Sequence, residues 1–487
     1  MFFCSACWLV LASAFALISS IKFHSPSFLA DSACLTYGRV HTAYLNCLLY
    51  GFCLQAGLGV ALWLLARLGQ TPLAQPWLVI VGTLLWNAGI KLGVLGILRG
   101  DGTGFEYLDI PGYAAWITIL GYLLIGLSGV LTFHQRCELR LFVSQWFIFT
   151  ALFWFPWIYA TAELLLVKFP VRGAAQVAVW AYYNTNLSTV WLPLVGLAAI
   201  FYFIPKLTQR DLHSGYLALF AFWMLILFGG WTGITHGAPL PAWMPAISTV
   251  ATMLLAVPLL AVALNVHLTL YGKSWHRSAD IPVRGAAVTE PADRNVRAPM
   301  PPPDELRPSL RANAPLQFIT VGAVALVLAW LMKMICAGVD VAYPLNLTWL
   351  TPAREQLNSY GFFSLVMFGA IYAILPRLTQ TEFPSPRLVR AHFWLALLGV
   401  LLTVVPLAGA GIVEALRMHD PDVPFVAIVK STLPFLRAST TGDLFLAFGH
   451  VIFLINVAGL AVRFYRPRVA GAYADATADL SLSEAQP

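Results

Sequence analysis

Histidine binds haem iron and copper well, and the chain has ten histidines that could do such chemistry. They are His24, His41, His134, His213, His236, His267, His276, His392, His419 and His450. No two of them lie one, two or four residues apart, so their spacing alone predicts no metal cluster. A lone histidine is more typical of an interfacial or helix-packing residue than of a metal ligand.

The cysteines offer one motif, a C-x-x-C formed by Cys4 and Cys7. No histidine follows it, which excludes a c-type haem attachment site. Because the pair falls inside an apolar run, we expect the two cysteines to act as apolar packing residues rather than as a redox centre.

These residues must be positioned by membrane-spanning helices. Of the 487 residues, 59% are hydrophobic and only 10% are charged, whereas about 25% of the residues of a soluble domain are charged. Twelve apolar runs are long enough to cross a hydrocarbon core about 30 Å thick: 5–22, 41–66, 76–98, 111–133, 141–166, 179–204, 216–232, 243–271, 316–337, 357–375, 388–415 and 442–464. The composition excludes a water-soluble enzyme and predicts an all-α integral membrane protein whose main partner is the lipid bilayer.

The net charge of +7 comes from Lys and Arg that lie mostly in short loops, so it does not indicate a nucleic-acid partner. With twelve spans, both chain ends lie on the same side of the membrane. That side holds about twice as many Lys and Arg as the opposite side, which predicts cytoplasmic termini. The first run is expected to be a retained span and not a signal peptide.

The long polar stretch 272–315 is rich in proline and mixed charge, and predicts a flexible cytoplasmic linker. It separates the first eight helices (1–271) from the last four (316–465). The tail 466–487 is expected to be disordered.

Several short motifs occur in one order along the chain. They are Trp86–Leu98, Glu106–Asp109, Tyr202–Lys206, Leu240–Trp243, Phe368–Arg377, His392–Trp394 and Arg437-Ala438. With them the chain resembles subunit I of the cbb-type cytochrome c oxidases, in the haem-copper oxidase superfamily that includes the nitric oxide reductases. The resemblance implies a twelve-transmembrane-helix bundle in a bacterial-type inner membrane. It also implies other respiratory-complex subunits or a c-type cytochrome as partners.

The chemistry of that family depends on six histidines, and only His41, the low-spin haem position on the second helix, is matched here. The other five positions, aligned from the nearest motifs, are Thr185, Thr232, Gly233, Arg354 and Gln356. Threonine and glycine do not replace imidazole on copper. A guanidinium stays protonated and cannot ligate iron, and glutamine is a weak iron ligand. We therefore expect no copper, no catalytic residue, and one haem b at most, held by His41.

Three functions stay open from the sequence. The first is a non-catalytic oxidase-like subunit that acts in the structure or assembly of a respiratory complex. The second is an active terminal oxidase or nitric oxide reductase subunit with unorthodox ligands. The third is a carrier of protons or a small solute, suggested by Lys91 and Glu414 inside spans; the role of Lys333, also inside a span, is open. Arg354 and Glu355 are expected either to form a polar plug of ion pairs or to mark a helix end that reaches water.

Overall fold

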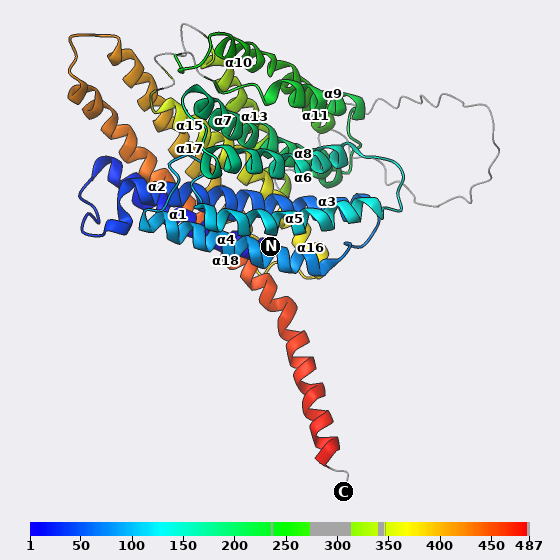
Figure 1. Ribbon diagram of the computed structural model, residues 1–487. Helices are drawn as coiled ribbons and strands as arrows, with labels where there is room; N and C mark the ends of the chain where they lie inside the picture. Colours follow the sequence, from blue (N-terminus) through cyan, green and yellow to red (C-terminus); the bar gives the residue numbers. More distant parts are fainter. Residues whose placement is uncertain (235–236, 273–312, 339–344, 346, 485–487) are drawn as a thin grey trace, which may run out of the picture.

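The computed structural model describes residues 1–234, 237–272, 313–338, 345 and 347–484. Within these ranges the chain is a bundle of helices without a strand (Figure 1). Eleven helical segments are long and apolar enough to cross a membrane, and the shorter apolar helix α9 stands where the seventh crossing was predicted. The predicted membrane bundle and the order of its helices are therefore confirmed.

Most helices begin and end close to the predicted runs, but the last one begins at Phe425 and so is much longer than the predicted run 442–464. Before the predicted linker they are α1 (Phe2–His24), α2 (Tyr37–Asn46), α3 (Gln55–Leu68), α4 (Pro76–Arg99), α5 (Gly112–His134), α6 (Val143–Ala162), α7 (Ala174–Thr185), α8 (Leu192–Thr208), α9 (Gly215–Gly229), α10 (Trp243–Leu254) and α11 (Ala256–Tyr271). After it they are α13 (Ala314–Ile335), α15 (Leu350–Gln356), α16 (Leu365–Thr379), α17 (Pro386–Met418) and α18 (Phe425–Glu484).

Local sequence signals set several of these helix starts. Pro76 and Pro386 open α4 and α17, where the missing proline N–H would have had no helical partner. The Ser214 hydroxyl caps α9 by accepting a hydrogen bond from the Leu217 N–H at 3.2 Å. Asn313 caps α13 in the same way.

Three spans form the centre of the bundle. The spans Tyr37–Leu68 and Ala174–Thr208 are each 89% buried over their most apolar stretch, and the span Leu350–Thr379 is 78% buried. Each is interrupted by a widened π-helical segment, namely η2 (Cys47–Leu54), η4 (Asn186–Trp191) and η6 (Leu357–Ser364). A π-helical turn shifts the faces of the two helix halves relative to each other and often marks a functional site.

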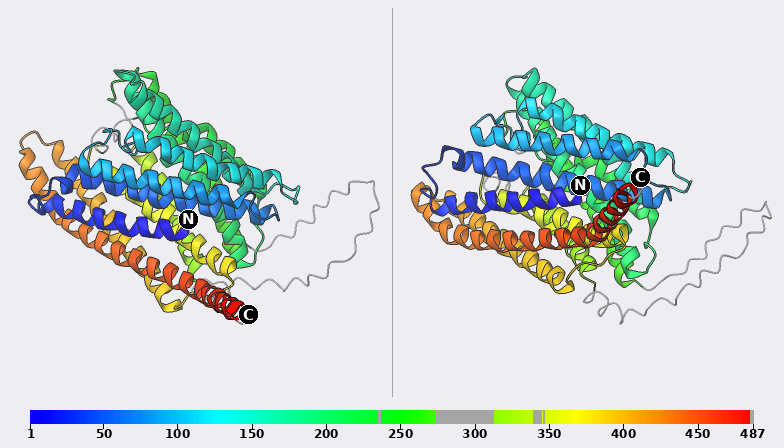
Figure 2. Two further views of the ribbon diagram at one scale, coloured as in Figure 1. Left: turned by 60° about the horizontal axis from the view of Figure 1, so that its bottom comes forward. Right: turned by 90° about the horizontal axis from the view of Figure 1, so that it is seen from below.

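The remaining helices surround this centre. Helix α1 packs against α2 and α18, and α17 lies along α18, as the views in Figure 2 also show. Helices α4 and α5 approach each other closely because glycines face each other across their contact. A Cβ on Gly121 would lie 2.6 Å from the Trp86 backbone nitrogen, and one on Gly82 would lie 2.8 Å from the Gly121 carbonyl oxygen.

The chain end differs from the prediction. Helix α18 continues to Glu484 and projects from the bundle (Figure 1), whereas disorder was expected for 466–487. The tail is rich in alanine, which has the highest helix propensity, so the chain continues the preceding helix. The predicted linker falls almost wholly on residues 273–312, outside the described residues.

We predict that Gly121→Ala lowers stability by about 1–3 kcal/mol, because the new methyl group meets the backbone of α4. Thermal unfolding of the purified protein in detergent measures this. Gly38→Ala is the matched control: Gly38 has open space around it in α2, and we expect a gain of about 0.5–1 kcal/mol there. Equal melting temperatures for the two variants would contradict the close α4–α5 packing.

Candidate functional site

A cavity of about 310 Å³ lies inside the bundle between the three central spans and α13. Its wall includes His41 of α2, Thr185 of α7, Lys333 of α13, and Arg354 and Gln356 of α15. Five of the six family positions singled out from the sequence therefore line one internal space, because Gly233 lines it as well. The volume is at the lower end of the range of small-molecule sites.

The three positions aligned with copper ligands meet in space. The Thr185 hydroxyl donates a hydrogen bond to the Thr232 carbonyl oxygen at 2.7 Å. A Cβ on Gly233 would lie 2.2 Å from the Thr185 Oγ1. Gly233 has φ +92°, in the left-handed region that suits glycine. The backbone after α9 therefore leaves no room for a side chain at Gly233.

Lys333 reaches this same point from α13. Its Nζ donates to the Thr232 Oγ1 at 2.8 Å and to the Thr189 Oγ1 at 2.5 Å. The sequence identified Lys333 as a charge inside a span but not its partners. Thr189 was missed, although it follows Thr185 by one helical turn on the same face, a spacing that signals a shared environment.

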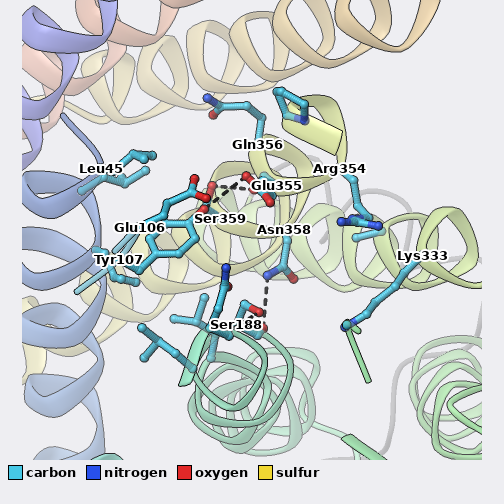
Figure 3. A pocket seen from close by; sticks show the side chains of 18 of the residues that line it. Leu45, Glu106, Tyr107, Ser188, Lys333, Arg354, Glu355, Gln356, Asn358 and Ser359 are labelled. Atoms are coloured by element: carbon cyan, nitrogen blue, oxygen red, sulfur yellow. Dashed lines mark hydrogen bonds between the residues drawn. The ribbon is translucent and has the colours of Figure 1, made fainter. Parts of the chain in front are cut away.

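The positions on α15 also face inward (Figure 3). The Gln356 Nε2 donates to the Tyr44 hydroxyl at 2.8 Å. The Tyr107 hydroxyl donates to a Glu355 carboxylate oxygen at 3.3 Å. Because Arg354 and Glu355 line the cavity, they are not a helix end in water. The side-chain hydrogen-bond partner of Glu355 is a tyrosine and not a cation. The structure therefore has a polar cavity where a plug of ion pairs was expected.

His41 is half-buried and lines the cavity as well. Its Nδ1 lies 3.1 Å from the Ser19 Oγ, and its ring stacks on Tyr37 with the ring centres 5.2 Å apart. These two contacts fix the orientation of the imidazole.

The other singled-out residues lie away from this arrangement. Lys91 is exposed on the outer face of α4. A Glu414 carboxylate oxygen accepts a hydrogen bond from the Trp349 backbone N–H at 3.1 Å. His236 lies outside the described residues.

Two further histidines are fully buried in packing contacts. The His392 Nδ1 lies 3.0 Å from the Tyr372 hydroxyl, and the His450 Nδ1 lies 2.6 Å from the Ser13 Oγ. Both rings pack against Phe368. They follow the general expectation for lone histidines in a helix bundle.

Two acidic groups of the loop after α4 have shifted pKa values. Burial, then the nearby charges of Glu355 and Asp109, raise the pKa of Glu106 to about 7. Burial also raises the pKa of Asp109 to about 6, against the opposing hydrogen bond from Asn46. This loop therefore brings a carboxyl group that readily holds a proton to the cavity wall, since Glu106 lines it.

Comparison with known proteins identifies this architecture. The family model described as cytochrome c and quinol oxidase polypeptide I matches residues 1–289 and 305–445. The chain belongs to this family. It is thus a multi-pass membrane protein of the cytochrome c oxidase subunit I type.

Two relatives show how far the likeness extends. A cytochrome c oxidase subunit 1 homolog of Azorhizobium caulinodans is 23% identical over 480 residues, which cover 92% of this chain and 79% of the relative. The cbb3-type cytochrome c oxidase subunit CcoN1 of Stutzerimonas stutzeri is 22% identical over 444 residues, which cover 88% of this chain and 86% of that subunit. The cbb-type resemblance is therefore confirmed over most of the chain.

A solved structure shares the fold. One chain of a haem-copper terminal oxidase dimer superposes with a TM-score of 0.68 at 14% identity, covering 94% of this chain and 84% of that chain. The helix arrangement of a haem-copper oxidase subunit is thus present here.

We predict that stability falls as the pH rises from about 4.5 to about 7. The raised pKa of Glu106 means that the folded chain keeps a proton that the unfolded chain releases in this window. Melting temperatures between these pH values measure the effect, and Glu106→Gln should flatten the profile. Asp211→Asn, an exposed acidic residue, should keep the wild-type profile; equal flattening by both variants would contradict the assignment to Glu106.

Proposed function

We propose that this member of the family does not hold the oxygen-reducing copper and acts as a structural or assembly subunit of a respiratory complex. The observation that carries the proposal is the position of the Lys333 ammonium, 2.8 Å from the Thr232 Oγ1. Thr232 is one of the positions aligned with copper ligands.

The chemistry of the donors supports this proposal. A hydroxyl group is a poor copper ligand compared with imidazole, and the Thr185 hydroxyl is already bound to a backbone carbonyl. A copper ion beside Lys333 would also face the repulsion of a like charge in a medium of low dielectric constant. No group of three His, Cys, Asp or Glu suited to a metal occurs among the described residues. The donor set therefore does not fit copper.

A haem fits only in part. His41 offers one imidazole, oriented by Ser19 and facing the cavity, so it is the residue that would hold a haem b. A bound haem would supply a one-electron redox centre. The facing position, Gln356, uses its amide to bind Tyr44 and supplies no second strong ligand.

The proposal also covers the partners of the chain, its membrane and its organisation into two parts. Its partners would be other respiratory subunits or a c-type cytochrome, and the relative from Stutzerimonas stutzeri is itself named as an oxidase subunit. We place the chain in a bacterial-type inner membrane with both termini in the cytoplasm, and we keep 1–271 and 316–465 as its two helical parts. The charged cavity favours one second function, the carrying of a proton or small solute.

Metal analysis of the purified full chain tests the proposal. We expect less than about a tenth of an equivalent of copper per chain after growth with added copper, because the donor set lacks imidazole. Lys333→Met should not raise this value, since the remaining hydroxyls still bind copper weakly. Stoichiometric copper in the wild-type chain would overturn the proposal and favour an active oxidase.

The haem content gives a separate prediction. A pyridine haemochrome assay should find at most one haem per chain, and His41→Ala should abolish it. His267→Ala removes an exposed histidine outside the cavity and should leave the content unchanged. Two haems per chain, or retention of haem in the His41 variant, would contradict His41 as the single ligand.

A further inference from the structure

Lys333 has a hydrogen-bond donor to spare at the cavity wall. An ammonium group carries three N–H donors. Two of them bind the hydroxyls of Thr189 and Thr232, and Lys333 also lines the cavity. The third N–H therefore remains for a group inside the cavity.

Arg354 adds a second cation on the same side. Figure 3 shows Lys333 and Arg354 along one side of the cavity, with Glu106 and Tyr107 along the other. In the part of the chain that the structure describes, no hydrogen bond engages the guanidinium of Arg354, which carries five N–H donors in a planar fork. This fork matches a planar group with two oxygens better than a spherical ion.

The two cations lie close enough to act on each other. The charge of Arg354 repels the Lys333 ammonium, and the charge of Glu355 attracts it. Glu355 in turn accepts a hydrogen bond from Tyr107. The carboxyl groups of Glu106 and Asp443 line the cavity as well, so the cavity carries charges of both signs, and an anion would bind beside the two cations.

We propose that Lys333 and Arg354 form a binding site for a small planar oxyanion group, such as a carboxylate, bicarbonate or nitrate. Arg354 would bind two oxygens of this group, and the free N–H of Lys333 would bind one. The site rests on the proposed function, because a copper ion beside Thr232 would displace the ammonium.

The planar oxyanion can be a simple anion or the carboxylate of a larger zwitterionic molecule. The acidic residues on the opposite wall of the cavity distinguish these two kinds of ligand. A simple anion needs only Lys333 and Arg354. An amphoteric molecule such as an amino acid would place its carboxylate there and its ammonium toward Glu106 and Glu355. The cavity of about 310 Å³ accommodates molecules of either kind.

Binding to the full chain in lipid nanodiscs tests the proposal. Nitrate, acetate and glycine are titrated separately by calorimetry at constant ionic strength, with chloride as the balancing ion. We expect saturable binding of at least one of them, weakened about tenfold or more by Lys333→Met and by Arg354→Gln, because each removes a charge-assisted hydrogen bond. If glycine alone binds, and if Glu106→Gln also weakens its affinity, the ligand is a zwitterionic molecule such as an amino acid.

Two control variants show whether the loss of affinity is specific to the proposed site. Lys91→Met removes an exposed lysine from another span and should leave the affinity unchanged. Arg354→Lys keeps the charge but loses the planar fork, so we expect an affinity between those of the wild type and Arg354→Gln. Equal weakening by Lys91→Met, or no saturable binding in a copper-free wild-type chain, would overturn this proposal alone. Stoichiometric copper would instead overturn the proposed function.

Discussion

The interior of this bundle depends on the hydrogen bonds of one ammonium group. Lys333 reaches from α13 to the hydroxyls of Thr189 and Thr232, and so joins three segments that are far apart in the sequence. In a medium of low dielectric constant such a charge is tolerated only where polar groups surround it. The polar cavity beside Lys333 follows from this constraint.

The chain has the family architecture, and we propose that the metal-binding side chains are replaced. The three central spans each contain a π-helical segment. Hydrogen bonds between side chains now join them: the Gln356 amide binds the Tyr44 hydroxyl, and the hydroxyls of Tyr50 and Tyr183 lie 2.5 Å apart. Side-chain hydrogen bonds between membrane helices contribute modestly to association, and close packing contributes the rest.

Much of the fold could be predicted from the sequence, and the site could be predicted in part. Run lengths and hydropathy located the membrane helices, because the bilayer thickness fixes the number of apolar residues that a crossing needs. The ordered motifs pointed to the family and to the positions Thr185 and Gln356. The helical tail was missed because its composition is compatible both with disorder and with the continuation of α18.

The sequence by itself determined that the chain crosses a membrane many times, and it predicted that five of the family's six histidines are replaced. Only the tertiary structure decided which of its buried charges meet. Lys91 and Lys333 look alike in the sequence, yet one faces outward and the other lines the cavity. The difference arises because the direction of a side chain in a helix of uniform hydrophobicity depends on how that helix packs against its neighbours, and an apolar run does not encode its own inward face.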